Sequence, residues 1–281
     1  MIDCVEIGNA RLYHADARSV SIEPESVDLI FTDPPYGHNN NSNDLIGNIE
    51  KALSRLGRGQ NPLRPIANDG KEADDLVRWF FSNSKAWLRS GGCCCCCCCG
   101  GGGPDPQFAR WSLWMQDAGL FFKQMIVWDK GPLGLGWHYR RSYETVLVAQ
   151  RDKMKCNWYD KSGCVENVIR PGMHGIRKMI PSKEEHPTEK PKELAALFIR
   201  LHSLPGDVVF DPFMGSGSTG VAAASLGRKF IGIEFDKRWF DLACRRVEQA
   251  VSHPIFESRK APVMGLLRQT RFREVNRKLK S

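Results

Sequence analysis

The four residues Asp33 to Tyr36, Asp-Pro-Pro-Tyr, combine groups that could hold and activate an amine. Two successive prolines restrict the backbone, so the groups around them are pre-positioned. The carboxylate of Asp33 and the carbonyl of Pro34 are fixed hydrogen-bond acceptors, and Tyr36 adds an aromatic face. This set suits an exocyclic amine on a planar ring, because two acceptors can hold both amine hydrogens while the nitrogen becomes tetrahedral. A plain turn beside a core tyrosine is the structural alternative, which these residues alone leave open.

A glycine-rich loop forms the second candidate site. Asp211 directly follows an apolar stretch, and Gly215, Gly217 and Gly220 fit the spacing Gly-x-Gly-x-x-Gly. Glycines let the backbone approach a ligand closely, and the carboxyl ends of strands in a doubly wound sheet are where ligands bind. Glu234 ends the next predicted strand, where a carboxylate can accept both hydroxyl hydrogens of a ribose. By themselves these residues indicate an adenosine-bearing cofactor.

Together, the two motifs resemble the signature of S-adenosylmethionine-dependent amino-methyltransferases that act on DNA. The order is similar to that of the β group of this family, with the catalytic motif first, a variable region next and the cofactor loop last. His186–Pro191 (HPTEKP), residues 232–236 (GIEFD) and the approach to the first motif, residues 25–37, also match. The resemblance covers about residues 11–251, and its details are similar to methylases of phage and prophage origin.

The resemblance implies a role for each matching residue. Glu234 would accept the ribose hydroxyls and Phe235 would lie beside the adenine, whose amino group Asp16 would meet. Thr188 and Lys190 would lie near the cofactor carboxylate, and no residue is expected to hold a metal. The implied catalytic residues are Asp33, Pro34, Pro35 and Tyr36, and the implied cofactor-binding residues are Asp16, Thr188, Lys190, Asp211, Pro212, Phe213, Gly215, Ser216, Gly217, Glu234 and Phe235.

Strand-like and helical stretches alternate along the chain, which is typical of an α/β sheet with helices on both faces. The resemblance implies a doubly wound, mostly parallel, seven-stranded class I methyltransferase sheet, circularly permuted so that the catalytic motif precedes the glycine loop. A catalytic domain over 1–251 would contain the candidate target-recognition region, 131–185. Strands are expected near Leu12, Val27–Thr32, Cys93–Cys99, Phe122–Trp128, Glu144–Ala149, Val208–Phe210 and Phe230–Ile233, and helices within 71–88, 104–120, 191–203, from about 218, and within 237–251.

Seven consecutive cysteines, Cys93 to Cys99, stand where the family has a central strand after a turn, here the sequence WLRSGG. Free cysteine is small and apolar and packs well on both faces of a sheet. Neighbouring side chains in a strand point to opposite faces, so seven in a row cannot converge on one ion. The tract is therefore predicted to be a buried strand rather than a metal or redox centre, and Gly100–Gly103 to be the loop beyond it.

Charge is concentrated at the end of the chain. Of the net charge of +8, six positive charges come from residues 253–281, which hold eight Lys/Arg and two acidic residues. A basic tail, 252–281, favours a polyanionic partner, although a merely solvated end has the same composition. The sequence contains no run of about 18 apolar residues, so no membrane span is predicted. The start of the chain does not resemble a signal peptide, so a cytoplasmic protein with reduced thiols is expected.

Double-stranded DNA is the implied partner, and a homodimer and a partner restriction nuclease are left open. Asp at the head of the first motif is commoner among the adenine enzymes of the family, so adenine N6 is the predicted target and cytosine N4 the main alternative. RNA or a protein amide would use the same chemistry. A non-catalytic nucleic-acid module with a cysteine metal site is disfavoured by the intact Asp33, Gly215 and Gly217. Residues 137–141 (WHYRR) could line a DNA path or pack ordinarily.

Overall fold

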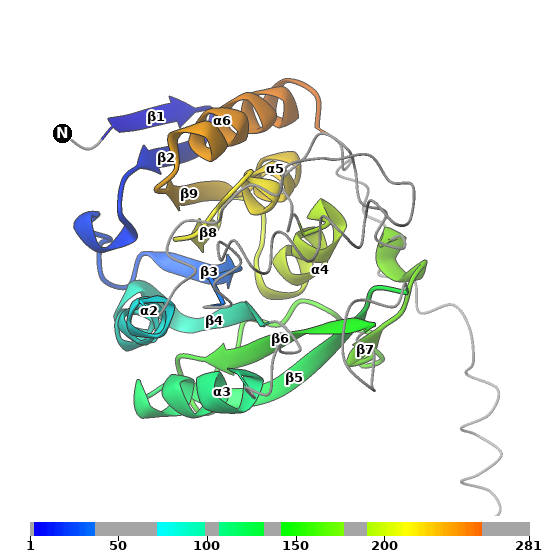
Figure 1. Ribbon diagram of the computed structural model, residues 1–281. Coiled ribbons are helices and arrows are strands. Elements are labelled where there is room, and N and C mark those ends of the chain that lie inside the picture. Colours follow the sequence, from blue (N-terminus) through cyan, green and yellow to red (C-terminus); the bar gives the residue numbers. More distant parts are fainter. Residues whose placement is uncertain (1–2, 37–71, 99–106, 132–141, 177–189, 255–281) are drawn as a thin grey trace, which may run out of the picture.

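One sheet of nine strands runs through the part of the chain that the computed structural model describes (Figure 1). Those residues are 3–36, 72–98, 107–131, 142–176 and 190–254. The strand order is β1-β2-β9-β8-β3-β4-β6-β5-β7. The strands are β1 (Asp3–Ile7), β2 (Ala10–His14), β3 (Val27–Thr32), β4 (Leu88–Cys98), β5 (Phe121–Asp129), β6 (Tyr143–Gln150), β7 (Val168–Ile169), β8 (Val208–Asp211) and β9 (Lys229–Glu234).

Five neighbouring strands, β2, β9, β8, β3 and β4, pair in parallel, and the sheet is thus mostly parallel as predicted. The antiparallel pairs are β1 with β2, β4 with β6, and β5 with β6. All seven predicted strands are present. The sequence analysis missed β1 and β7, since β1 is a short, half-exposed strand at the sheet edge and β7 has only two residues. Strands of that kind carry little apolar pattern.

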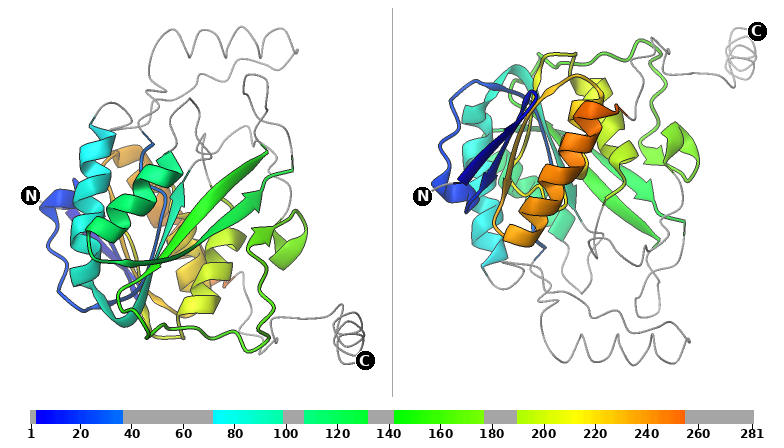
Figure 2. Two further views of the ribbon diagram at one scale, coloured as in Figure 1. Left: turned by 90° about the horizontal axis from the view of Figure 1, so that it is seen from below. Right: turned by 90° about the horizontal axis from the view of Figure 1, so that it is seen from above.

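Helices cover both faces of the sheet (Figure 2). On one face lie α2 and α3, and on the other lie α4, α5 and α6, which pack side by side. Each predicted helical stretch contains one of these helices. Their bounds are α2 (Ala73–Trp87), α3 (Gln107–Asp117), α4 (Lys192–His202), α5 (Ser218–Ser225) and α6 (Lys237–Ser252), and two short 3-10 helices are η1 (Ala17–Ser19) and η2 (Met173–Gly175).

Cysteines form the buried half of β4, as the sequence analysis predicted. Cys93 to Cys98 are each at most 1% exposed. The odd-numbered cysteines belong to the core under α4, α5 and α6, and the even-numbered ones to the core under α2 and α3. This alternation is what a strand buried on both faces requires, because successive side chains point to opposite sides. Cys99 and Gly100–Gly103 lie outside the described residues.

The turn predicted before these cysteines is not a separate turn. Leu88 already pairs with Val27, whereas the next paired residues are Cys93 and Leu29, so three extra residues of β4 bulge out between the two pairs. Gly91, in this bulge, has φ 88°, which glycine adopts at little cost. A glycine pair is typical of a turn. Here the pairs Val27–Leu88 before the bulge and Leu29–Cys93 after it keep these residues within one strand.

The parallel strands end together at one edge of the sheet. Thr32, Asp211 and Glu234 are the last residues of β3, β8 and β9. The catalytic motif follows β3 directly and the glycine loop follows β8, so the topology brings the two motifs to the same edge. Among the described helices, none combines the length and the apolar composition of a membrane span.

Candidate active site

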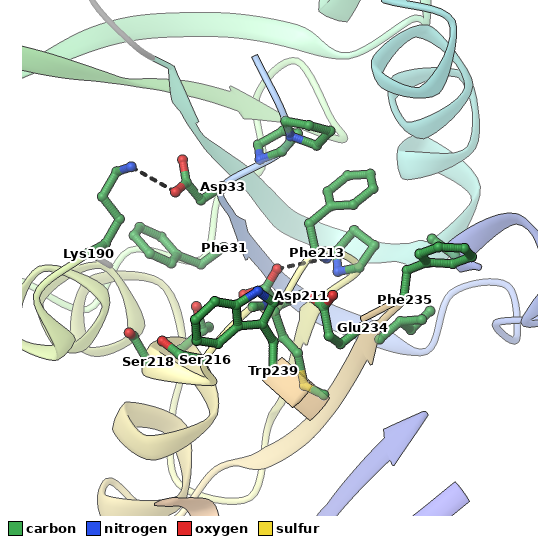
Figure 3. Close-up of a pocket in the computed structure, with 18 of the residues that line it drawn as sticks. Phe31, Asp33, Lys190, Asp211, Phe213, Ser216, Ser218, Glu234, Phe235 and Trp239 are labelled. Atoms are coloured by element: carbon green, nitrogen blue, oxygen red, sulfur yellow. Dashed lines mark hydrogen bonds and ion pairs between the residues drawn. The ribbon is translucent and has the colours of Figure 1, made fainter. Parts of the chain in front are cut away.

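A pocket opens at the carboxyl ends of β3, β8 and β9 (Figure 3). Thirteen of the fifteen predicted site residues line it, drawn from both motifs. Of the other two, Thr188 lies outside the described residues and Gly217 lies behind the lining. The 13 are Asp16, Asp33, Pro34, Pro35, Tyr36, Lys190, Asp211, Pro212, Phe213, Gly215, Ser216, Glu234 and Phe235.

Asp33 is held at one end of the pocket by a buried cation. The Lys190 Nζ donates to Asp33 Oδ2 at 2.7 Å (Figure 3). It also donates to the Tyr36 hydroxyl at 3.1 Å. The same ammonium forms an ion pair at 3.2 Å with Glu144, which the sequence analysis did not single out as a site residue. The Tyr36 hydroxyl donates to Asp33 Oδ1. Among the described residues each Asp33 oxygen therefore has one partner, and a carboxylate oxygen can accept a further hydrogen bond from a substrate amine.

Burial and charge set the proton affinity of these carboxyl groups. The pKa of Asp33 is raised, mainly because burial disfavours the charged form, and the charge of Glu144 adds to this; Lys190 opposes the rise. For Glu144, burial also acts to raise the pKa, but Lys190 and Lys130 together outweigh it and the pKa is lowered. Asp33 is thus a stronger proton acceptor than an ordinary aspartate, while the lowered pKa of Glu144 favours its charged form beside Lys190.

Tyr36 is fixed by its surroundings. Its ring is 8% exposed and packs at 5.9 Å, centroid to centroid, from Trp111 of α3. Its backbone carbonyl accepts a hydrogen bond from the buried side chain of Gln107. Together with the hydrogen bonds of the hydroxyl to Asp33 and Lys190, these contacts hold the residue in place before any substrate arrives.

Asp211 and the glycine loop form the floor of the pocket. Thr32 donates its hydroxyl to Asp211 Oδ1 at 2.6 Å, and the Phe213 amide donates to the same oxygen at 3.1 Å. Burial raises the pKa of Asp211 to about 6 against these bonds. Gly217 has φ 82°, and a Cβ there would lie 2.9 Å from the Ala243 Cβ of α6. Gly217 is therefore needed for the turn and for packing, which explains why it does not line the pocket.

Glu234 lines the pocket on the side of the glycine loop, and two backbone amides hold its carboxylate. The Gly215 amide donates to Oε2 at 2.9 Å and the Asp236 amide donates to Oε1 at 2.7 Å. Burial raises the pKa of Glu234 to about 7 despite both bonds. A ligand that donates hydroxyl hydrogens to this carboxylate would favour its charged form, and the two amides already orient both oxygens.

A family model described as DNA methylase matches residues 27–245. This stretch contains both motifs, nearly the whole pocket and most of the sheet. The chain belongs to this family of N6/N4 DNA methylases.

Two similar proteins are methyltransferases by name. The DNA adenine methyltransferase YhdJ of Escherichia coli is 27% identical over 94% of this chain and 92% of its own length. The type II methyltransferase M2.DpnII of Streptococcus pneumoniae is 27% identical over 84% of this chain and 89% of its own. Both matches cover most of the methylase.

Solved structures agree with the fold. The complex of M1.HpyAVI with SAM has a TM-score of 0.58 at 26% identity and covers 85% of this methylase and 99% of that chain. The cytosine-N4-specific PvuII DNA methyltransferase has a TM-score of 0.61 at 19% identity, with 88% and 91% coverage, and shows the fold alone. The sheet is that of class I methyltransferases.

The other residues that the sequence analysis singled out are Asp16, Phe235 and residues 137–141. Asp16 caps η1 and binds Arg18 through both oxygens, at 2.9 and 2.6 Å, and these bonds lower its pKa. Phe235 is 54% exposed at the pocket mouth, where an aromatic ring could cover a base. Residues 137–141 lie outside the described part of the chain, so their predicted place on a DNA path stays a prediction.

Several pocket residues were missed in the sequence analysis. Phe31 and Trp239 line the pocket, from β3 and α6, and Glu144 enters through its ion pair with Lys190. Phe31 and Trp239 look like core positions in sequence, because aromatic residues at strand and helix spacing usually pack inside. An acid at the start of the predicted strand 144–149 was the available signal for Glu144, because unpaired acids are rare in buried strands.

Proposed function

We propose that this DNA methylase transfers a methyl group from S-adenosylmethionine to N6 of adenine in duplex DNA. The observation that carries the proposal is the shared pocket, which the Asp33–Tyr36 motif lines together with the glycine loop and the Glu234 carboxylate. The adenine assignment follows YhdJ, a DNA adenine methyltransferase by name, together with Asp at the head of the first motif.

The residues present fit S-adenosylmethionine. Glu234 offers a buried, pre-oriented carboxylate for the ribose hydroxyls, and Phe235 lies next to it at the pocket mouth. Asp211 and the loop Phe213–Gly215 line the pocket and would lie beside the amino-acid part of the cofactor. When bound, the cofactor supplies an electrophilic methyl group whose bond to sulfur breaks with the electron pair going to sulfur.

Asp33 handles the amine. A target base flipped from the duplex would place its amino group against the Asp33 carboxylate and the Pro34 carbonyl, which accept its two hydrogens. Holding these hydrogens directs the nitrogen lone pair toward the methyl carbon, so that nitrogen gains the new bond. Positioning and fixed acceptors lower the barrier, without a covalent bond to the enzyme. Because the pKa of Asp33 is raised, its carboxylate can then accept the proton that the methylated nitrogen loses.

The directions of the strands indicate which stretches of the candidate target-recognition region would contact DNA. β5 ends at Asp129 opposite Tyr143, at the pocket edge of the sheet, whereas Gln150, the last residue of β6, pairs with Cys93 toward the opposite edge. Within the candidate target-recognition region, 131–185, the stretches 131–142 and 170–185 therefore adjoin strand ends at the pocket edge. We infer that these two stretches supply the base-reading contacts, and that residues 151–164 do not.

Mass spectrometry of the product tests the proposal. DNA from cells that express the methylase, or DNA treated with the purified protein and S-adenosylmethionine, is digested to nucleosides and weighed. N6-methyladenine is expected. N4-methylcytosine without N6-methyladenine would show the substrate assignment wrong while leaving the pocket chemistry intact. Methylated RNA or protein without methylated DNA would overturn duplex DNA as the substrate.

A further inference from the structure

Two thiols and an imidazole meet at the edge of the sheet opposite the pocket. Cys93 is the first of the cysteines in β4, Cys156 follows β6, and His202 is the last residue of α4. One sulfur from each cysteine and one ring nitrogen of His202 all lie within 4.8 Å of one another. These residues are far apart in sequence, and none of them lines the active-site pocket.

We propose that Cys93, Cys156 and His202 form a binding site for a thiophilic divalent cation, Zn²⁺ above all. Two sulfurs and one imidazole nitrogen are a donor set that Zn²⁺ prefers, and three protein ligands leave the fourth tetrahedral position for water. Two thiolates balance the charge of the ion, so the occupied site would be neutral and compatible with burial. The ion would connect β4, the segment after β6 and α4.

The spacing of the donors suits such an ion. With Zn–S bonds of about 2.3 Å, two ligands of a tetrahedral ion have sulfurs about 3.8 Å apart. The Cys93 and Cys156 sulfurs are 3.5 Å apart, which is also the distance of a thiol hydrogen bond. Only small shifts of side chains would bring all three donors into contact with one ion.

His202 is held as metal-binding histidines are. Its Nδ1 lies 3.0 Å from the backbone carbonyl oxygen of Asn157, which can only accept, so Nδ1 carries the hydrogen. The neutral ring then has its lone pair on Nε2, the atom that a cation needs. Trp158 packs edge-on against the ring at 5.3 Å and fixes its plane.

The surroundings also hold the site in place. The Asn157 amide donates to the Gly91 carbonyl at 2.7 Å, and the Tyr159 amide donates to the Leu201 carbonyl at 2.9 Å. Backbone bonds thus tie the segment after β6 to both other elements on either side of the cluster. The other described cysteines of β4 do not belong to the cluster. The even-numbered ones face the opposite core, and Cys95 and Cys97 share the face of Cys93 but lie farther along the strand.

An ion has a path of entry to the cluster. Cys93 is fully buried, whereas Cys156 is partly exposed, so an ion can reach the site past the Cys156 side chain. The exposure of Cys156 also means that a reagent for thiols can report on whether the site is occupied.

Metal titration of the full chain tests the proposal. Reduced protein is titrated with Co²⁺ as a spectroscopic probe and then with Zn²⁺, and bound metal is counted by elemental analysis. We expect one ion per chain, the visible bands of tetrahedral cobalt–thiolate, and a melting temperature higher by about 5 °C at saturating Zn²⁺. Cys156→Ser should lower the affinity by at least about 100-fold, since loss of a direct ligand exceeds the effect of losing a supporting partner.

Cys164→Ser is the matched control, because Cys164 is an exposed cysteine in the same segment and should bind metal like the wild type. If Cys156→Ser fails to fold, alkylation of the wild type decides: Zn²⁺ must protect Cys156 from iodoacetamide and leave Cys164 reactive. Absence of binding by the reduced protein, equal binding by both variants, or no protection of Cys156 would overturn the proposal. A Cys93–Cys156 disulfide in a protein that binds no metal when reduced would do the same.

Discussion

At the scale of single residues, the pocket depends on two buried carboxyl groups that are held by different partners. Asp33 is countered by the Lys190 ammonium, whereas Glu234 accepts its hydrogen bonds from the backbone amides of Gly215 and Asp236. Both lie at the carboxyl ends of parallel strands. In the proposed function Asp33 would accept hydrogen bonds from an amine and Glu234 from hydroxyl groups. The pH dependence of the methyl-transfer rate should therefore report on Asp33, and that of S-adenosylmethionine binding on Glu234.

Lys190→Met should shift the acidic limb of the transfer rate to higher pH. The Lys190 charge lowers the pKa of Asp33, so its removal raises that pKa further and Asp33 is a carboxylate only at higher pH. Lys190→Arg keeps the charge and should restore most of the wild-type profile. Transfer rates at saturating substrate, followed across the acidic and neutral range, measure this. An acidic limb at the same pH in all three proteins would contradict the role of Lys190.

S-adenosylmethionine should bind more tightly as pH rises through about 7. The ribose hydroxyls favour the charged form of Glu234, whose pKa is about 7 without a ligand, so affinity should improve about 10-fold between about pH 6 and 8. Calorimetric titration measures it. Glu234→Gln should lose most of this dependence and bind more weakly by about 1–3 kcal/mol. A wild-type affinity that does not change with pH would contradict the assignment of Glu234.

The same pKa predicts the stability of the unliganded protein. Glu234 has a higher pKa folded, about 7, than its ordinary value of 4.5, so the folded state binds more protons between these values. The contribution of this group to stability is therefore greatest below about pH 4.5, and it is lost as pH rises toward 7. Asp211 acts in the same direction between 3.8 and about 6.

At the scale of elements, the strand order determines where the site lies, and most of the strands that carry the site could be predicted from the sequence. The apolar run before Asp33 and the stretch before Asp211 are buried parallel strands, whose identity the residues alone indicate. The cysteine strand of β4 was predicted from the family resemblance, which has a central strand after the turn, and from the small apolar character of cysteine. The bulge before Cys93 was not, because the pairing of β4 with β3 on one side and β6 on the other decides whether Gly91 ends a turn or stays within a strand.

Replacing Gly217 by Ala should destabilise the protein more than replacing Gly206. Both glycines have positive φ, 82° and 90°, so each alanine has a backbone cost of about 1–2 kcal/mol. Only at Gly217 would the new Cβ also meet α6, 2.9 Å from the Ala243 Cβ, whereas nothing lies within 4 Å at Gly206. Denaturant unfolding measures the difference. Equal losses in the two variants would mean that α5 and α6 do not pack as described.

At the scale of the whole molecule, the pocket and the cluster of Cys93, Cys156 and His202 lie at opposite edges of one sheet. Glu144, at the pocket end of β6, meets Lys190, while the other end of the same strand lies beside Cys93. Neither the convergence of Cys156 and His202 on Cys93 nor the Glu144–Lys190 pair has a local sequence signature. Both depend on the antiparallel direction of β6, which periodicity does not reveal. The family resemblance predicted the pocket because its residues form contiguous motifs.

Removing residues 258–281 should weaken binding to all DNA sequences alike. These residues hold all eight of the basic side chains counted in the tail, and phosphate contacts carry no sequence information. The plot of log affinity against log salt should become less steep, by about 0.9 for each phosphate that the tail neutralises. Fluorescence anisotropy with two unrelated duplexes at several salt concentrations measures this. An unchanged slope would show that the tail is only solvated.

Separating cofactor binding from methyl transfer in Asp33→Ala tests the central claim most directly. In the proposed function Asp33 would hold the amine and Glu234 the ribose. The variant should therefore bind S-adenosylmethionine within a few-fold of the wild type, while single-turnover transfer to duplex DNA falls by about 100-fold or more. Glu234→Ala is the matched control. Its main loss should be in affinity for S-adenosylmethionine rather than in the single-turnover rate at saturating cofactor. Equal transfer rates for Asp33→Ala and wild type would contradict the account of the pocket.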